Sequence, residues 1–237
     1  MTELLQSWKW RDEKIAEFFD DCEDVPELLN SSVLIVRMYI QGAYRPDHSL
    51  ERAMLVKFWR TVYDYQEDAL FLILCRRFDA AFAMMRLASE LARDLARMSE
   101  DRVNFEMWMN KETERHTKHY KKTFRFDMTD TLEKYVYSQY KTFSGWGVHG
   151  HLTGDTARKP GGTTPCGNYV TLEISEDSIL ENIGIWGLSF LSVHQMCARV
   201  FDPEIQKSRF PADFADFSVE AGNLFKALIQ RGKSKKD

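Results

Sequence analysis

Two histidines and a serine lie in a glycine-rich stretch in the middle of the chain, and these residue types can perform acid–base chemistry. The stretch reads FSGWGVHGHLTGD, residues 143–155, and contains Ser144, His149 and His151. Histidine titrates near neutral pH, so it can act as a general acid or base, or hold a phosphate when charged. The alternative is a helix-ending turn in which these side chains bind free carbonyl groups. No G-x-S-x-G elbow is present, so we do not expect a serine hydrolase.

An arginine and a glutamate four residues apart form the second candidate. Arg86 and Glu90 meet on one face of a helix predicted over 79–98, opposite an apolar stripe. One interpretation is a solvated charged face, which contributes little to stability. The other is a pair buried between two helices, which is costly unless it serves a site. This helix alone favours the solvated face.

The third candidate is a basic segment with interleaved aromatic residues, WMNKETERHTKHYKKTFRF, residues 108–126. Such a pattern can grip a phosphate backbone and stack on bases. The candidate nucleic-acid-binding residues are Lys111, Arg115, Lys118, Lys121 and Lys122. A solvated helix is the favoured alternative. Glu112, His116 and His119 have metal-ligand spacing, but the surrounding cations repel a metal ion, so we predict no metal site.

Two further residues are candidates for ligand binding, together with His151. Tyr140 lies one turn before Ser144 on a helix that opens near Asp130. His194 lies in a strongly apolar helix, in line with Phe190 and Cys197. We interpret His194 as a core residue with one hydrogen bond, unless it faces His149.

The pattern of apolar residues predicts an all-α fold, a single-domain bundle of about seven helices over residues 1–231. A basic tail, 232–237, is expected to be disordered, and at most a short strand lies near 169–174. Residues 153–168 are predicted to form a loop because they are rich in Gly, Pro and Thr. Ser49 and Asp79 are the expected N-caps of two helices, and either Thr129 or Asp130 is expected to open a third. The other helices are expected at 2–19, 26–42, 50–75, 101–125, 176–201 and 212–230.

Composition narrows the class of protein. The chain has 237 residues, 29% of them charged, with a net charge of −4, so no global field favours nucleic acid or an anionic membrane. Its four cysteines are scattered, which argues against a zinc site or a disulfide framework and favours a reducing cytoplasm. No apolar run is long enough to cross a bilayer. The P-loop, G-x-G-x-x-G and HExxH motifs are missing, and we predict no cofactor and no membrane association.

The order ALFLILCRRFDAAFAMMRLASE, then YSQYKTFSGWGVHG, resembles a group of bacterial all-helical domains of unknown function. Their shared pattern is R-x-x-x-E followed by a Tyr, a Ser and a His, and here it falls on Arg86, Glu90, Tyr140, Ser144 and His149. The resemblance covers roughly residues 65–155. It implies that Arg86, Glu90 and His149 converge inside the bundle, and it supplies no activity.

A more distant resemblance is to the HEPN-type helical ribonucleases of toxin and phage-defence systems. Those enzymes carry an Arg, four to six residues and then a His on one helix, and no pair in this sequence has that spacing. The resemblance implies a metal-independent ribonuclease in which His149 is the acid or base. Arg86, brought from another helix, would stabilise charge on the phosphate, and Glu90 would orient it.

Two functions therefore follow from the sequence. The favoured one is a non-catalytic binding or regulatory module, in which Arg86, Glu90, Ser144 and His149 form a buried polar network or ligand pocket. The alternative is the ribonuclease, so the sequence does not decide whether the protein is an enzyme. RNA or a protein is the expected partner, and a homo-oligomer is left open.

Overall fold

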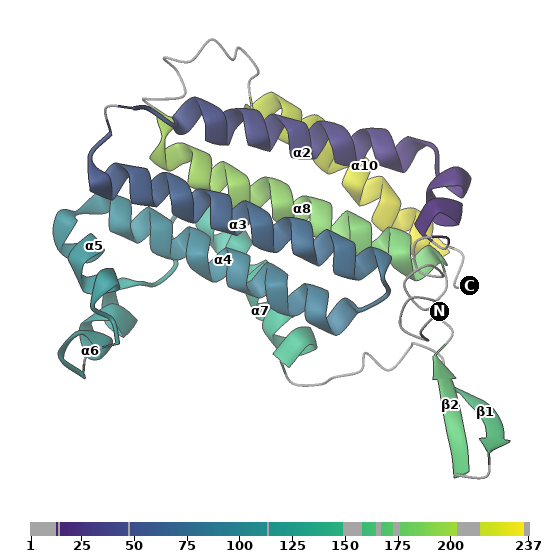
Figure 1. Cartoon of the computed structure of the whole chain (residues 1–237). Coiled ribbons are helices and arrows are strands. Elements are labelled where there is room, and N and C mark those ends of the chain that lie inside the picture. Colours follow the sequence, from purple (N-terminus) through teal and green to yellow (C-terminus); the bar gives the residue numbers. More distant parts are fainter. Residues whose placement is uncertain are drawn as a thin grey trace, which may run out of the picture.

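The computed structural model describes residues 13, 15–46, 48–112, 114–148, 158–164, 167–172, 176–202 and 214–234. In this part of the chain eight helices of eight residues or more pack as one bundle, which confirms the all-α class (Figure 1). The helices are α2 (Asp24–Ala43), α3 (Leu50–Leu74), α4 (Phe78–Glu100), α5 (Arg102–Met109), α6 (Glu114–Thr123), α7 (Thr131–Val148), α8 (Glu176–Val200) and α10 (Phe214–Ser234). Residues 15–21 are also helical, and the start of the predicted first helix lies outside the described residues.

Helix α8 is the centre of the bundle and contacts α2, α3, α4, α7 and α10. Its side chains Ile183, Trp186 and Phe190 are fully buried, as expected for a helix that is apolar on nearly every side. Gly187 allows α10 to approach closely, because a Cβ atom there would lie 2.2 Å from the ring of Phe225. None of the described helices is long and apolar enough to span a membrane.

Helices α3 and α4 are separated between residues 74 and 78, close to the predicted bounds of 50–75 and 79–98. Ser49 caps α3, since its hydroxyl accepts the Arg52 N–H at 3.2 Å. Two residues after the end of α3, Arg76 adopts the left-handed conformation, with φ of 60°. The N–H groups of Arg76 and Arg77 donate to the carbonyls of Ile73 and Leu72, both at 2.8 Å, which is the Schellman pattern of a helix end.

The prediction that Asp79 caps α4 is wrong. The helix already begins at Phe78, and Arg77 occupies the cap position without a side-chain hydrogen bond. The Schellman turn decides the start, because it leaves Arg77 as the last residue outside the helix. In α7, by contrast, Asp130, one of the two predicted starts, is the cap and accepts the Glu133 N–H at 2.8 Å.

The single helix predicted over 101–125 is also wrong, since the chain breaks it into α5 and α6. The break lets Trp108 and Tyr120 reach the same oxygen, Oδ2 of Asp94, at 2.8 and 2.7 Å. In one straight helix these two residues would stand about 18 Å apart along the axis. A shared hydrogen-bond acceptor on α4 therefore requires the turn.

Two strands form an antiparallel hairpin, drawn to one side of the helices in Figure 1. Strand β2 (Gly167–Leu172) lies where a strand was predicted, and β1 (Arg158–Thr164) pairs with it. Residues 158–164 are therefore a strand and not loop, because β2 needs a hydrogen-bonding partner. At the other end of the chain, α10 runs to Ser234, so residues 232–234 are helical, and 235–237 lie outside the described residues.

Candidate functional site

One face of α4 carries a row of charged residues that includes Arg86, Glu90 and Arg97, and α7 packs against this face. Helices α4 and α7 run antiparallel, because Phe82 stacks on Phe143 at one end and Arg97 binds Glu133 at the other. The interpretation of this row as a solvated face is therefore wrong for Arg97, whereas the Arg86–Glu90 pair is neither solvated nor buried, with both side chains 28% exposed. The charged row lies between two helices, and the exposed fraction of the Arg97 side chain is only 13%.

The most buried part of this face is centred on Asp94, which joins α4 to α5 and α6. Its carboxylate accepts hydrogen bonds from Trp108 on α5, from Tyr120 on α6 and from its neighbour Arg93. Burial, followed by the charge of Asp94, raises the pKa of Tyr120 above its ordinary range, so the hydroxyl remains a donor. These contacts satisfy both carboxylate oxygens and hold the two short helices in place.

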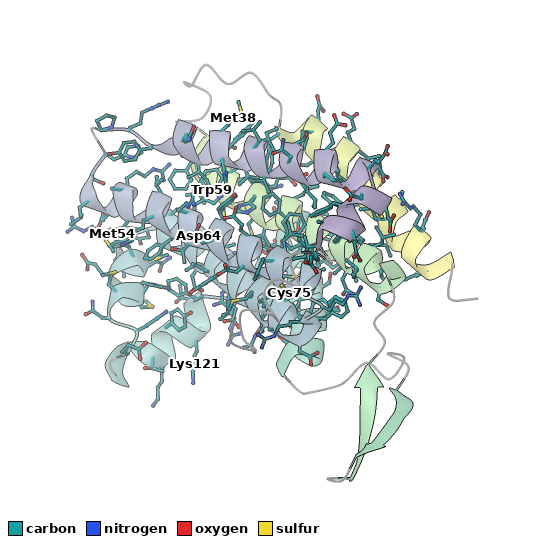
Figure 2. All side chains as sticks on the ribbon, turned by 45° about the vertical axis from the view of Figure 1, so that its right-hand side comes forward. Met38, Met54, Trp59, Asp64, Cys75 and Lys121 are labelled. Atoms are coloured by element: carbon teal, nitrogen blue, oxygen red, sulfur yellow. The ribbon has the colours of Figure 1, made fainter. Side chains whose placement is uncertain are left out.

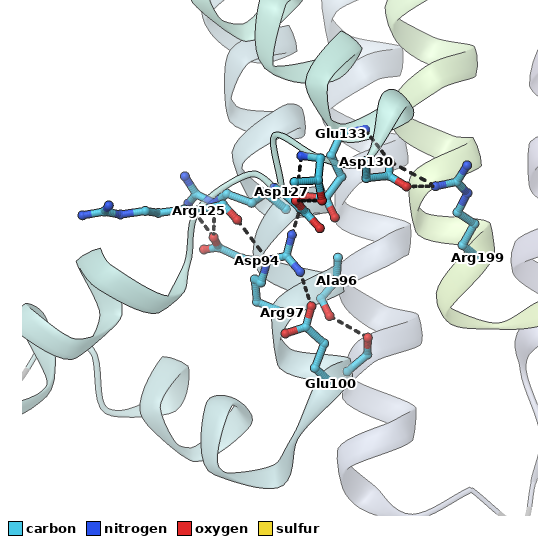
Figure 3. A network of polar contacts seen from close by, with 12 residues as sticks. Asp94, Ala96, Arg97, Glu100, Arg125, Asp127, Asp130, Glu133 and Arg199 are labelled. Carbon is cyan, nitrogen blue, oxygen red and sulfur yellow. Dashed lines mark hydrogen bonds and ion pairs between the residues drawn. The ribbon is translucent and has the colours of Figure 1, made fainter.

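A second network centred on Arg97 lies at the start of α7 (Figure 3). The guanidinium donates to Glu133 Oε2 at 2.5 Å and to the Arg125 carbonyl at 2.9 Å, and it also pairs with Glu100. Glu133 in turn accepts the Asp127 N–H at 2.7 Å. The network is closed by bonds between protein groups, so its role is to join α4, α7 and the segment between α6 and α7.

At the other end of the same face, four predicted site residues lie on neighbouring turns of α4 and α7. Arg86 binds Glu90 through Nε and Nη2 at 3.1 and 3.0 Å, and its guanidinium carbon is 5.7 Å from the centre of the Tyr140 ring. Both side chains of the pair are 28% exposed. Ser144, one turn after Tyr140, has a buried hydroxyl with no hydrogen-bond partner in the part of the chain that the structure describes. We refer to Arg86, Glu90, Tyr140 and Ser144 as the α4–α7 cluster.

The structure does not test the convergence of this cluster with His149. Both His149 and His151 lie outside the described residues. The last described residue of α7, Val148, is eight residues beyond Tyr140, about 12 Å along the helix axis.

His194 lies in the core, in the interface between α8 and α3. It is fully buried, and its Nδ1 accepts the indole N–H of Trp59 at 3.0 Å. Burial lowers the pKa of His194 to about 3, so the imidazole is neutral and carries its proton on Nε2. This nitrogen has no hydrogen-bond partner within the described ranges. Ser192, two residues earlier, bonds to Gln139 on α7, so α8 directs Ser192 towards α7 and His194 towards α3.

The basic segment separates into an exposed cationic side and an inward aromatic side. Lys118, Lys121 and Lys122 are exposed, whereas the side chain of Arg115 lies outside the described part. Tyr120 stacks on the buried Phe124, with ring centres 4.6 Å apart. The aromatic side chains of this segment therefore pack within the protein, which contradicts the interpretation that they stack on bases. Lys111 lies 4.0 Å from the centre of the Trp108 ring.

Sequence reasoning missed Asp94 and Glu133, the two acids that organise the covered face. Asp94 lies beside the apolar stripe, next to Leu95, and the inward faces of Trp108 and Tyr120 each bring one polar atom that needs a partner. An acid beside an apolar stripe, together with two aromatic residues that each carry a polar atom, could have predicted the buried Asp94 site.

Comparisons with known families, proteins and structures found no match. No family model, no curated protein and no solved structure matches the chain. The two resemblances drawn from the sequence therefore remain predictions.

Proposed function

We propose that this protein is a non-catalytic binding or regulatory module whose ligand site is the α4–α7 cluster. The observation that carries the proposal is the hydroxyl of Ser144, which is buried with no hydrogen-bond partner among the described residues, one turn after the Tyr140 ring that contacts a partly exposed ion pair. A buried hydroxyl without a hydrogen bond costs about 1–3 kcal/mol. A ligand that bonds to this hydroxyl recovers that free energy on binding.

The chemistry of the cluster favours a small polar ligand with both donor and acceptor groups. Arg86 offers the N–H groups of a planar guanidinium, and Glu90 offers carboxylate oxygens. The ring of Tyr140 lies beside the guanidinium and provides a flat apolar surface. The Arg93 and Arg97 guanidinium groups on the same face are committed to Asp94, Glu133 and the Arg125 carbonyl, so Arg86 is the arginine of this face best placed for a ligand.

A thermal-shift experiment with single-site variants tests the proposal. Wild-type protein is screened against inorganic phosphate, mononucleotides, nucleosides and amino acids, and any compound that raises Tm is tested again on Arg86→Gln and Ser144→Ala. We expect at least one compound to act on the wild type and to lose its effect in both variants. Arg60→Gln is the matched control, because Arg60 forms the same i, i+4 pair with Asp64 and lies 4.8 Å from the Tyr63 ring on α3.

The same preparation distinguishes the ribonuclease. Wild type and His149→Ala are incubated with mixed cellular RNA in EDTA, and fragment lengths are followed. Cleavage by the wild type that is lost in the variant would replace the binding module with a metal-independent nuclease. A compound that still acts on Arg86→Gln and Ser144→Ala would move the ligand site away from the cluster.

A further inference from the structure

The outer side of α6 is a row of cations at helical spacing. Lys118, Lys121 and Lys122 stand at i, i+3 and i+4, and all three are exposed. Arg125 follows the helix and folds back onto it, with its Nε donating to the Lys121 carbonyl at 3.1 Å. Figure 2 shows Lys121 on α6, directed away from the bundle. We call these four side chains the α6 stripe.

The α6 stripe is not neutralised from within the described part of the protein. None of its four cations forms an ion pair with a described carboxylate. Like charges at i, i+4 destabilise a helix by about 0.2–0.5 kcal/mol per pair. Residues 111–125 contain six Lys or Arg and two Asp or Glu, a net charge of +4, in a chain whose net charge is −4. The remaining residues therefore sum to −8, so positive charge is concentrated on this one segment.

The stripe is also held in a fixed position. Tyr120 on the inner side of α6 donates to the buried Asp94, and Phe124 packs in the core. Because α6 is held rigidly by these contacts, less conformational entropy is lost when a partner binds to it. Because the aromatic rings face inward, the partner meets cations and not rings, so recognition rests on its charge.

We infer that the α6 stripe binds the phosphate backbone of a nucleic acid without sequence preference, at a surface independent of the α4–α7 cluster. Cations on successive turns of a helix, about 5.4 Å apart along its axis, present point charges to successive phosphates. A lipid surface fits less well, because the apolar residues of α6 are turned into the protein and leave nothing to enter the acyl chains.

Fluorescence anisotropy tests the inference with two labelled 30-nucleotide RNAs, oligouridine and a mixed sequence. Binding by the full chain is measured from 50 to 200 mM salt. Four phosphate contacts on a single strand give a slope of about −2.8 in log K against log salt, so the affinity should fall about 50-fold over this range. The two RNAs should bind equally.

The test variant is the triple substitution Lys118→Gln, Lys121→Gln and Lys122→Gln, which keeps helix propensity and removes three charges. Its slope should flatten by about 2. The matched control is Lys57→Gln, Lys134→Gln and Lys226→Gln, three exposed lysines on α3, α7 and α10, which removes the same net charge and should keep the wild-type slope.

Three results would overturn the inference. One is no RNA binding by the wild type at 50 mM salt, and another is an equal loss of slope in the control triple. The last is tighter binding to phosphatidylserine vesicles than to RNA at equal phosphate concentration, which would assign the stripe to a membrane. Circular dichroism of each triple variant establishes that the comparison is between folded proteins.

Discussion

His194 should make the stability of the bundle depend on pH from about 6.5 downwards, so that the loss begins before ordinary carboxylates titrate. In the folded protein its pKa is lowered to about 3 by burial, against an ordinary value of 6.5. Between these two values the unfolded chain binds one proton at His194 that the folded protein does not. The folded state is therefore fully favoured above pH 6.5, and its advantage is lost as the pH falls towards 3.

The size of this effect follows from the pKa difference. One proton bound only by the unfolded chain changes the free energy of unfolding by about 1.4 kcal/mol per pH unit. From pH 6.5 to pH 4 the loss assigned to His194 is about 3 kcal/mol, a large part of the stability of an ordinary domain.

Urea unfolding, followed by tryptophan fluorescence at half-unit steps from pH 7.5 to 4, measures it against His194→Gln. The glutamine oxygen can still accept the Trp59 N–H, and the titratable group is gone. The difference in unfolding free energy between wild type and variant should shift by about 3 kcal/mol over this range, while carboxylates contribute equally to both proteins. A difference that stays constant with pH would refute the reasoning, as would an imidazole NMR signal of His194 that titrates near pH 6.5 in the folded protein.

Three substitutions test other parts of the structure. Asp94→Asn should destabilise the protein by about 3–5 kcal/mol, because it leaves the Arg93 charge without its partner, and hydrogen exchange should rise first in α5 and α6. Ser144→Ala should raise the free energy of unfolding by about 1 kcal/mol in urea. Ser89→Ala is the control and should not raise it, because the Ser89 hydroxyl donates to the Met85 carbonyl at 2.9 Å. Equal effects would contradict the assignment of an unsatisfied hydroxyl at Ser144. Arg76→Gly should raise Tm, because glycine adopts a φ of 60° without the cost of about 1 kcal/mol that a side chain brings, and a lower Tm would mean that the arginine side chain stabilises the turn.

Local patterns in the sequence predict the elements whose signals are local. Helix α8 was predicted as a strongly apolar helix over 176–201, and a helix of that pattern belongs at the centre of a bundle, where the structure has it. Ser49 was recognised as a cap, and Asp130 as one of two candidates, because a cap needs only a neighbouring N–H group. These features depend on residues within one turn of the chain.

The features that the sequence missed depend on distant partners. The break between α5 and α6 follows from the demand of Trp108 and Tyr120 for one oxygen of Asp94, which lies on another helix. The packing of α7 on the charged face of α4 is likewise a tertiary contact, which the periodicity of apolar residues within α4 cannot predict. In the α4–α7 cluster the residue types were found from the sequence, whereas the unsatisfied Ser144 hydroxyl is visible only in the packed structure.

The central position of α8 also determines when, during synthesis, the helices made earlier can complete their packing. Helices α3 and α4 pack on α8, which begins 76 residues after α4 ends, at Glu176. At about 5–20 residues per second, ribosomal synthesis takes roughly 4–15 s to supply those residues. Until then Trp59 has neither the His194 acceptor for its indole N–H nor the ring of Phe201 against its own. The α3–α4 pair therefore leaves the ribosome with an uncovered apolar face, and a nascent-chain chaperone has its best opportunity in that interval.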